Sequence, residues 1–306
     1  MNSSRERELI VLGTASQVPT RTRNHNGYVL RWDGQTVLFD PGEGTQRQLT
    51  LAGVSPTRIT AICITHAHGD HCLGLPGVLQ RLSLEGVTGP VPLVYPAAVE
   101  EYIDRLRRAS AYEDRLVLDP HPVSEAGPVL HLPGLVLEAR PLRHRVPTFG
   151  YRLVEPDGRR MLADRLAARG IAGPDVRRLQ HDGVLLTPQG PVHLADVSDP
   201  RPGQRFAFVM DTGLCPEALA LAQDADLLVC EATFGDAEAA LAPLYGHLTA
   251  RQAGEMARDA GARRLVLTHF SQRYADVSPL LAQAGEAFPD VVVAEDLARI
   301  PVPDRV

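Results

Sequence analysis

Three histidines and one aspartate lie close together in the segment His66-Ala67-His68-Gly69-Asp70-His71. Imidazole nitrogens and carboxylate oxygens are donors that suit zinc. Because alternate side chains of a loop can point apart, His66 and His68 could hold one ion while Asp70 and His71 turn to a second. A solvated histidine-rich loop is the other interpretation, and the length and order of the segment argue against it.

These four donors cannot complete two zinc sites, because each ion takes about four ligands, or three and a water at a catalytic site. The missing donors must come from later in the chain. His144, Asp211 and His269 are the best candidates, since each borders a predicted strand and lies in turn-like sequence. The histidines without that placement are interpreted as surface or satisfied core residues: His25, His121, His131, His181 and His193.

The elements that must position these residues include several apolar segments with the character of strands. Four of them end at a residue able to bind metal or transfer a proton: 59–65 before His66, 206–210 before Asp211, 227–230 before Glu231 and 265–268 before His269. Ligands of α/β sheets gather outside the carboxyl ends of the strands. The sequence therefore predicts that these four residues share one site.

The remaining pattern alternates strands with helices. Further strands are predicted at 9–13, 28–32, 36–40 and 291–294, and helices at 45–51, 72–84 and 97–109. This alternation predicts a layered α/β protein, with one domain over residues 1–306. The stretch 152–198 differs, because it is rich in glycine and proline and has one short helical segment at 161–169. We interpret it as a protruding insertion rather than core.

Composition excludes several classes of function. All 31 basic residues are arginine, which rules out a lysine nucleophile, a Schiff base and the lysine of a phosphate-binding P-loop. The 4 cysteines form no C-x-x-C pair. The first eight residues are polar, so we expect no signal peptide, and no apolar stretch reaches the length of ~18 residues that spans a membrane. A cytoplasmic location is the expectation.

Beyond these patterns, the chain resembles the tRNase Z family of the metallo-β-lactamase superfamily. The H-x-H-x-D-H segment after a strand is the hallmark of the superfamily. Further segments match the family in order over nearly the whole chain: 12–14, 38–46, 142–147, 210–212, 231–234, 246–250 and 268–274. The chain departs from the family at Gly246-His247-Leu248-Thr249, where Gly-His-Ser-Thr is commoner, and at Met210, where many members have glycine.

The resemblance implies an αββα sandwich, a homodimer and two zinc ions. His66, His68 and His144 would hold one ion, and Asp70, His71 and His269 the other, with Asp211 as the bridge. A hydroxide bridging the ions would be the nucleophile, Asp70 would be its general base, and Asp40 would orient the ligand imidazoles. The implied activity is removal of 3′ trailers from precursor tRNA, which leaves a 3′-hydroxyl on the tRNA.

His247 is not needed as a zinc ligand, because seven other donors suffice. Glu231 ends a predicted strand and could hydrogen-bond the far nitrogen of His247, which would fix its tautomer and raise its pKa. The pair would then act as a general acid toward the leaving oxygen. The alternative is a buried Glu–His pair that only holds two loops together.

The family carries a flexible arm that grips tRNA, and Gly173-Pro174 resembles part of it. Residues 140–178 contain ten arginines and four acidic residues, a charge of +6 against −6 for the whole chain. A basic projection on an acidic body would suit phosphate contacts, although a solvated arginine-rich loop is the equal alternative. The predicted arm residues are Arg159, Arg160, Arg165, Arg169, Gly173, Pro174, Arg177 and Arg178.

Other activities of the same fold stay open at this point. A phosphodiesterase for small phosphodiesters would need the same metal site but not the arm. A thioester hydrolase of the glyoxalase type would need neither Glu231 with His247 nor the arm. A β-lactamase should carry a signal peptide, and a member that only binds RNA would not need intact metal ligands.

Overall fold

The structure is a computed structural model that describes residues 6–305. The chain divides into two compact units. Residues 155–204 form the smaller unit, and the residues before and after it form the larger one. None of the helices in the described residues is long and apolar enough to cross a membrane.

The first sheet of the larger unit has seven strands in the order β18-β1-β2-β3-β4-β5-β6. Its four antiparallel members come first in that order, and β3 to β6 pair in parallel. The strands are β1 (Arg7–Gly13), β2 (Gly27–Trp32), β3 (Gln35–Phe39), β4 (Ala61–Cys63), β5 (Val91–Pro96), β6 (Leu118–Val123) and β18 (Arg299–Pro301).

The second sheet also has seven strands, in the order β17-β16-β15-β14-β9-β8-β7. Strands β14 to β17 run parallel, whereas β7, β8, β9 and β14 pair antiparallel. The strands are β7 (Gly127–Leu132), β8 (Leu135–Pro141), β9 (Phe149–Val154), β14 (Arg205–Val209), β15 (Leu227–Glu231), β16 (Leu265–Thr268) and β17 (Val291–Val293).

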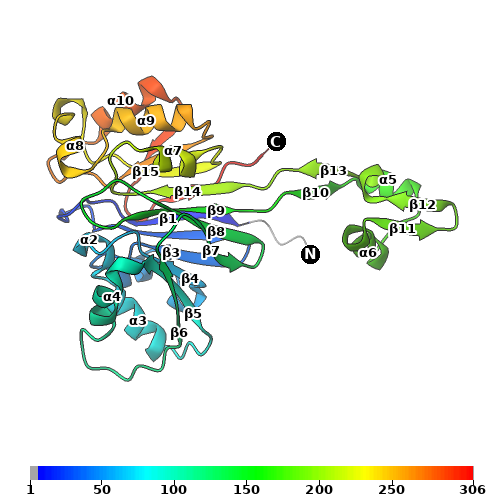
Figure 1. Cartoon of the computed structure of the whole chain (residues 1–306), viewed down its shortest axis with the longest axis horizontal. Helices are drawn as coiled ribbons and strands as arrows, with labels where there is room; N and C mark the ends of the chain where they lie inside the picture. Colours follow the sequence, from blue (N-terminus) through cyan, green and yellow to red (C-terminus); the bar gives the residue numbers. More distant parts are fainter. Residues whose placement is uncertain (1–5, 306) are drawn as a thin grey trace. The chain divides into compact units, whose positions relative to one another are not determined.

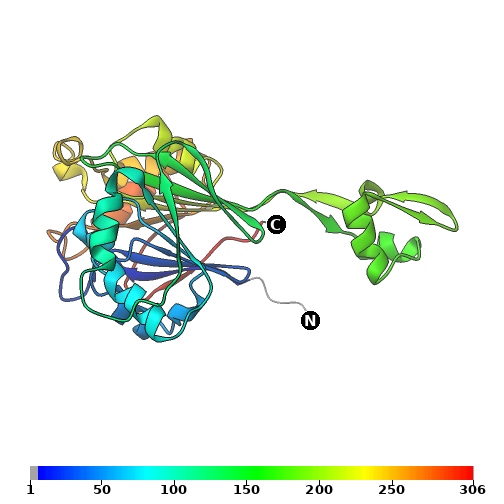
Figure 2. The same ribbon diagram turned by 60° about the horizontal axis from the view of Figure 1, so that its bottom comes forward.

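Helices cover the outer face of each sheet (Figures 1 and 2). The helices over the first sheet are α1 (Thr45–Leu51), α2 (Gly69–Cys72), α3 (Leu75–Leu84) and α4 (Glu100–Arg107). Those over the second are α7 (Pro216–Ala222), α8 (Ala242–Tyr245), α9 (Ala250–Asp259) and α10 (Ser278–Ala287). Short 3₁₀ turns occupy Pro56–Arg58, Ala97–Val99 and Asp236–Glu238.

Three apolar cores match these layers. One fills the space between the sheets with large side chains such as Tyr28, Phe39 and Phe208. The other two lie between each sheet and its helices, for example around Leu79 on one side and Leu221 on the other. This arrangement of helix, sheet, sheet and helix confirms the fold predicted from the sequence.

Some elements differ from those predicted. The predicted helix 72–84 begins only at Leu75 as α3, because Cys72 ends the separate helix α2. Between them, a Cβ at Gly74 would lie 1.9 Å from the carbonyl oxygen of Gly42. No bounds were predicted for β5 to β9. β6 is mostly exposed and contains two prolines, which hides an apolar alternation, whereas β8 and β9 have the burial pattern of ordinary strands and were missed. β4 ends at Cys63, so the loop that carries the histidines begins earlier than expected.

The smaller unit has a core of its own, which includes Leu166, Leu179 and Val192. It contains two hairpin-like ladders and two helices: β10 (Gly158–Met161) with β13 (Ser198–Arg201), β11 (Val184–Thr187) with β12 (Gly190–His193), α5 (Ala163–Ala168), α6 (Pro174–Asp182) and a 3₁₀ turn at Leu194–Val197. The unit begins at residue 155 rather than 152, because Arg152–Val154 complete β9, and it ends at residue 204 because β13 pairs with β10.

Candidate metal centre

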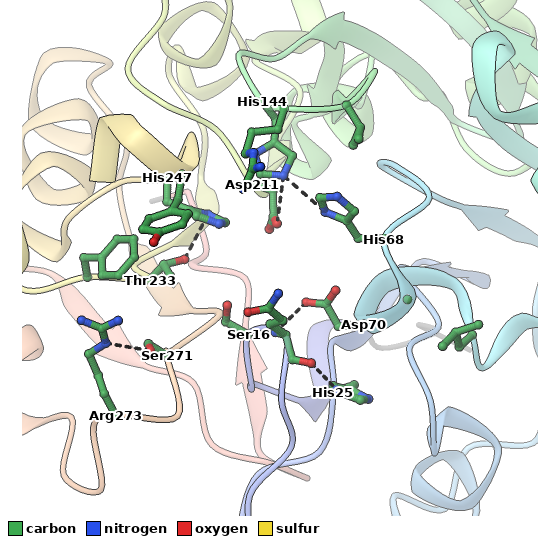
Figure 3. Close-up of a pocket in the computed structure, with 17 residues that line it drawn as sticks. Ser16, His25, His68, Asp70, His144, Asp211, Thr233, His247, Ser271 and Arg273 are labelled. Carbon is green, nitrogen blue, oxygen red and sulfur yellow. Dashed lines mark hydrogen bonds and ion pairs between the residues drawn. The ribbon is translucent and has the colours of Figure 1, made fainter. Parts of the chain in front are cut away.

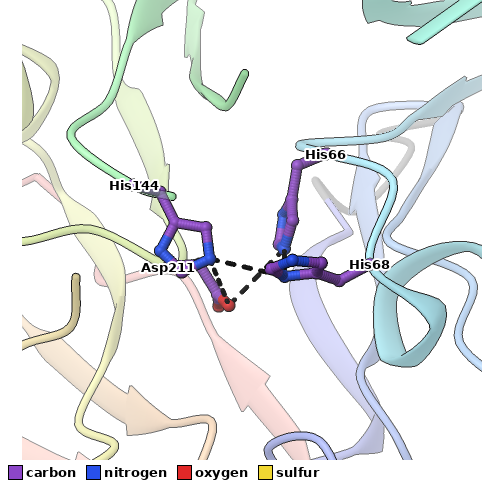
Figure 4. A group of neighbouring side chains, drawn as sticks. All are labelled: His66, His68, His144 and Asp211. Atoms are coloured by element: carbon purple, nitrogen blue, oxygen red, sulfur yellow. Dashed lines mark hydrogen bonds and ion pairs between the residues drawn. The ribbon is translucent and has the colours of Figure 1, made fainter. Parts of the chain in front are cut away.

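The structure brings all seven predicted ligands together beyond the ends of strands from both sheets. His66 and His68 follow β4, His144 lies on the loop from β8 to β9, and these three form one group with Asp211 (Figure 4). The second group comprises Asp70, His71 and His269. In each group the potential ligand atoms all lie within 4.8 Å of one another.

Asp211 lies between the two groups and turns one carboxylate oxygen to each. Its Oδ2 is 3.5 Å from His66 Nε2 and 3.7 Å from His144 Nε2. Its Oδ1 is 3.4 Å from His71 Nε2 and 3.0 Å from His269 Nε2. This is the geometry that a bridging carboxylate would need.

The far nitrogen of each of four histidines is held by an oxygen. The Nδ1 atoms bond to Thr65 Oγ1 (His66, 3.0 Å), Asp40 Oδ2 (His71, 2.8 Å), the Gly246 carbonyl (His144, 2.9 Å) and Thr233 Oγ1 (His269, 2.8 Å). Protonated Nδ1 atoms leave lone pairs on Nε2, directed at the centre. Asp40, predicted to orient ligand imidazoles, thus contacts one of them directly.

The cluster has the properties of a cation site. His66 Nε2 lies 3.0 Å from His68 Nδ1, and His71 Nε2 lies 3.3 Å from His269 Nε2, so nitrogen lone pairs face each other. The buried Asp211 Oδ1 makes no hydrogen bond in the described residues. Burial alone would lower the pKa of His71, yet Asp211, Asp70 and Asp40 raise it well above its usual value. The residues present therefore fit divalent metal ions, which would supply the missing positive charge.

Three residues of the centre adopt left-handed backbone conformations where strands end. The φ angles are 43° at Asp40, 39° at Asp211 and 60° at His269. Such conformations cost non-glycine residues roughly 1–3 kcal/mol each and persist where the surroundings impose them. Each turns the chain sharply at the strand end, and the side chain consequently points into the centre.

Asp70 is positioned by a segment that the sequence analysis did not connect to the site. The backbone N–H of Gln17 donates to Asp70 Oδ2 at 2.8 Å, and Gln17 itself has a φ of 51°. His25 Nε2 donates to the Gln17 carbonyl at 3.1 Å. His25 was interpreted as a surface or core histidine, but it lines the pocket of the centre (Figure 3). The folding of the loop between β1 and β2 brings His25 to the pocket, and no pattern in the sequence marks that contact.

Glu231 and His247 form the predicted pair. His247 Nδ1 lies 3.0 Å from Glu231 Oε1, and Glu231 is fully buried. The Thr212 N–H also donates to Glu231, at 2.6 Å. Burial would lower the pKa of His247, but Glu231 outweighs it and raises the pKa to about 9. With Nδ1 engaged by Glu231, the Nε2 of His247 is the atom left for chemistry in the pocket.

Thr233 links this pair to the metal centre. Because His269 Nδ1 donates to Thr233 Oγ1 at 2.8 Å, the single hydroxyl hydrogen of Thr233 is free to bond Glu231 Oε2, which it does at 2.5 Å. The order of donors therefore runs from His269 through Thr233 to Glu231. Neither contact was predicted from the sequence.

Part of this arrangement opens into a pocket of about 670 Å³, whose lining includes His68, Asp70, His144, Asp211, Thr233 and His247 (Figure 3). His66, His71, Glu231 and His269 are buried and do not line it. His247, Thr233 and Arg273 lie on one side of it, and His68 and Asp70 on the other. Arg145 and Arg273 are exposed at the pocket, and neither forms an ion pair within residues 6–305. The other histidines named above lie on β6, β7, α6 and β12, outside the pocket: His121, His131, His181 and His193.

The predicted arm residues all belong to the smaller unit. Arg165, Arg169, Arg177 and Arg178 are exposed on or next to α5 and α6, and Gly173-Pro174 begins α6. On β10, Arg159 bonds Ser198 and Arg160 pairs with Asp199 at 3.4 Å.

The predicted basic charge of the arm needs a correction. Residues 155–204 contain seven arginines and seven acidic residues, so the unit is neutral overall. Four of the arginines counted in the predicted basic stretch lie in the larger unit: Arg140, Arg143, Arg145 and Arg152. Part of the basic charge expected of the arm therefore lies next to the metal centre, where Arg143 and Arg145 flank His144.

Comparison with known proteins agrees with this centre. Residues 20–179 match the family model described as the metallo-beta-lactamase superfamily, and residues 194–270 match a beta-lactamase superfamily domain. The chain is 58% identical to a protein named ribonuclease Z from Salinispora arenicola, over 98% of this chain and 97% of that protein. It is 59% identical to ribonuclease Z of Nocardia farcinica, over 98% and 99% of the two chains.

A solved structure is similar over the same extent. The crystal structure of the short form of human tRNase Z superposes with a TM-score of 0.71 at 29% identity and covers 97% of this chain and 100% of that one. The similarity therefore includes both the sandwich and the segments that carry the centre.

The bridging position of Asp211 predicts how metal content depends on single residues. Asp211→Ala should lower the occupancy of both metal groups, whereas His144→Ala should chiefly weaken one. Elemental analysis of each purified variant, compared with the wild-type protein, measures the metal bound per chain. If both variants lost the same part of their bound metal, Asp211 would not be a bridge between the two groups.

The contact of His25 with Gln17 predicts an effect on metal affinity without any contact to metal. His25→Phe should weaken binding at the group of Asp70, His71 and His269 by about 10- to 100-fold, as expected for loss of an outer partner. His25→Gln places an amide donor near the Nε2 position and should restore most of the affinity. Competition with a chelator gives both values, and equal affinity of His25→Phe and the wild type would exclude this role.

Proposed function

Since the chain belongs to the ribonuclease Z family of the metallo-β-lactamase superfamily, we propose that it removes 3′ trailers from precursor tRNA and leaves a 3′-hydroxyl on the tRNA. The observation that carries this proposal is that both metal-ligand groups and the His247–Glu231 pair contribute to one pocket, which His68, Asp70, His144, Asp211 and His247 line. A hydrolase whose leaving group is an alkoxide needs metal ions to activate water and an acid to protonate the departing oxygen. One incubation with a 3′-extended precursor tRNA, followed by analysis of the new 3′ end, tests it.

We propose two zinc ions per chain, because seven imidazole and carboxylate donors divide into a group of four and a group of three. A third possible group, Asp211 with His247 and His269, shares two of these residues, and Glu231 holds Nδ1 of its His247. His66, His68 and His144 would hold one ion, Asp70, His71 and His269 the other, and Asp211 both. When bound, such a pair of ions lowers the pKa of water and stabilises negative charge on a phosphate.

Asp70 would orient the attacking water and accept its proton. Its carboxylate is nine-tenths buried and is fixed by the Gln17 N–H at 2.8 Å. Neighbouring His71 and His269 hold its pKa well below its usual range although burial acts to raise it. The carboxylate is therefore ionised and can accept a hydrogen bond from the water.

His247 would donate a proton to the departing 3′ oxygen. Glu231 fixes the ring through Nδ1, so that Nε2 is the donor toward the pocket. Arg145 and Arg273, exposed at the same pocket, would contact phosphates that flank the cleaved bond. General acid catalysis of this kind contributes typically ~10²–10⁴-fold in rate.

The smaller unit would be the tRNA-binding arm of the family. Its exposed Arg169 and Arg177 form no ion pair in the described residues and could contact phosphates. We also retain a homodimer and a cytoplasmic location as predictions, of which the first is tested by the mass of the protein in solution.

A phosphodiesterase that acts on small phosphodiesters is the alternative. It is favoured by one observation: every residue that lines the pocket belongs to the larger unit, so a small substrate would need nothing from residues 155–204. Parallel assays on precursor tRNA and on a nitrophenyl phosphodiester separate the two functions.

The general-acid role predicts that the effect of losing His247 depends on the leaving group. His247→Ala should lower turnover of precursor tRNA by about 10²–10⁴-fold and keep its metal content. On a nitrophenyl phosphodiester, whose leaving group needs no proton, the loss should be much smaller. His121→Ala, outside the pocket, is the control for both rates. Equal losses on both substrates, or loss of metal, would contradict the role.

The pairing of Val154 with Arg205 predicts that the smaller unit can be removed cleanly. These residues oppose each other on β9 and β14, so an Asn-Gly turn can replace residues 155–204 as a two-residue hairpin connection. The shortened protein should keep its metal and its activity on the small phosphodiester. Cleavage of precursor tRNA should fall on the order of 100-fold, because the large substrate loses its positioning.

A milder change checks the same point without altering the chain length. Arg169→Glu with Arg177→Glu should weaken tRNA binding and leave nitrophenyl phosphodiester hydrolysis unchanged. Similar losses on both substrates in the shortened protein would mean that the unit supports the fold and not the substrate.

A further inference from the structure

Two aromatic side chains stand at the pocket beside His247. Phe234 follows β15 and is almost completely buried, and Tyr245 ends α8. Their rings lie 6.3 Å apart with an interplanar angle of 35°. Phe234 also meets the His247 ring edge to face at 6.0 Å, and the Arg273 guanidinium lies 5.1 Å from its centroid. Phe234 therefore lies against the predicted general acid, and Tyr245 lies beside Phe234.

Tyr245 is too exposed for its ring to serve only as part of the apolar core. Aromatic residues are only 5% of the chain, and Tyr102 and Tyr245 are the exposed ones in its described part, at 52% and 46%. The Tyr245 hydroxyl makes no hydrogen bond within residues 6–305. The Tyr102 ring lies on α4, away from the pocket, with Arg105 over its face. Tyr245 thus presents apolar ring surface to a pocket that is otherwise rich in polar groups.

The position of His247 decides which part of an RNA this surface meets. Cleavage breaks the bond from phosphorus to the 3′ oxygen, water supplies the new oxygen on phosphorus, and the 3′ oxygen takes the proton. The ribose that carries this oxygen must then lie against His247. Its own base is one sugar away, within reach of the pocket wall that Phe234, against the histidine ring, and Tyr245 form together.

We infer that Tyr245, backed by Phe234, stacks on the base of the nucleotide that retains the 3′-hydroxyl after cleavage. The inference rests on the proposed function and adds to it a subsite for one nucleobase. Stacking needs a planar ring and no particular pattern of hydrogen bonds, so any base would be accepted. The ligand class is a purine or pyrimidine ring of single-stranded RNA, held next to the cleaved bond.

The test pairs a protein change with a substrate change. Tyr245→Ala should lower kcat/KM on precursor tRNA by about 5- to 100-fold, the range expected from loss of one stacked base. Tyr245→Phe should keep nearly the full rate, since it keeps the ring. Tyr102→Ala, which removes the other exposed aromatic ring, should behave as the wild type. On a nitrophenyl phosphodiester, which carries no nucleobase beside the cleaved bond, Tyr245→Ala should lose much less activity than on precursor tRNA.

Precursor tRNAs with one abasic nucleotide locate the stacked base. When the last retained nucleotide is abasic, the wild type should slow to the rate of Tyr245→Ala, and the substitution should then have no further effect. When the first trailer nucleotide is abasic, the effect of Tyr245→Ala should persist in full. The inference would be overturned if Tyr245→Ala still slowed cleavage of the tRNA whose last retained nucleotide is abasic. It would also be overturned if the effect of Tyr245→Ala disappeared only when the first trailer nucleotide is abasic.

Two other outcomes are also decisive. A loss on the nitrophenyl phosphodiester equal to that on precursor tRNA would mean that Tyr245 only supports His247, which overturns the subsite. If the wild type leaves precursor tRNA uncut but hydrolyses the small phosphodiester, the proposed function fails, and the subsite fails with it for a separate reason.

Discussion

Four carboxylates are buried at one end of this sandwich, and their charge is the constraint on which the site depends. Asp40 and Glu231 are fully buried, and Asp70 and Asp211 are at most 9% exposed. Removing each ionised carboxylate from water costs several kcal/mol unless positive charge and hydrogen bonds compensate it. Burial lowers the pKa of His66 and of His144, so these two imidazoles add no positive charge. Divalent cations are therefore part of the charge balance of the fold as well as of its chemistry.

The same constraint accounts for the local backbone. The ligands come from loops of both sheets, so they meet only when the apolar core between the sheets has formed. Asp211 and His269 each turn through a left-handed conformation at the end of a parallel strand, which no isolated loop would hold. The sandwich supplies the rigidity, since neighbouring strands β14, β15 and β16 fix the starting points of three site residues in register.

How far the sequence predicts such a site depends on whether a residue is marked by local pattern. The segment from His66 to His71 is marked by its own spacing, and Asp211 and His269 by the apolar strands before them. His25, Thr233 and Tyr245 carry no such mark, because their roles depend on which loops meet in space. For the arm, a local pattern misled the prediction. The arginines counted along residues 140–178 belong to two structural units, so the basic charge predicted for the arm was wrong.

That division bears on how an enzyme with net charge −6 could handle RNA. Long-range attraction is absent from both the whole chain and its neutral smaller unit, so steering by net charge cannot bring the substrate in. What remains is short-range: exposed arginines such as Arg169 and Arg177 in one unit, and Arg145 and Arg273 beside the metal centre in the other. Such arginines bind only when the shape of the RNA places its phosphates within contact distance. Selectivity would then come from a substrate that engages arginines of both units, and the metal centre itself need not distinguish one phosphodiester from another.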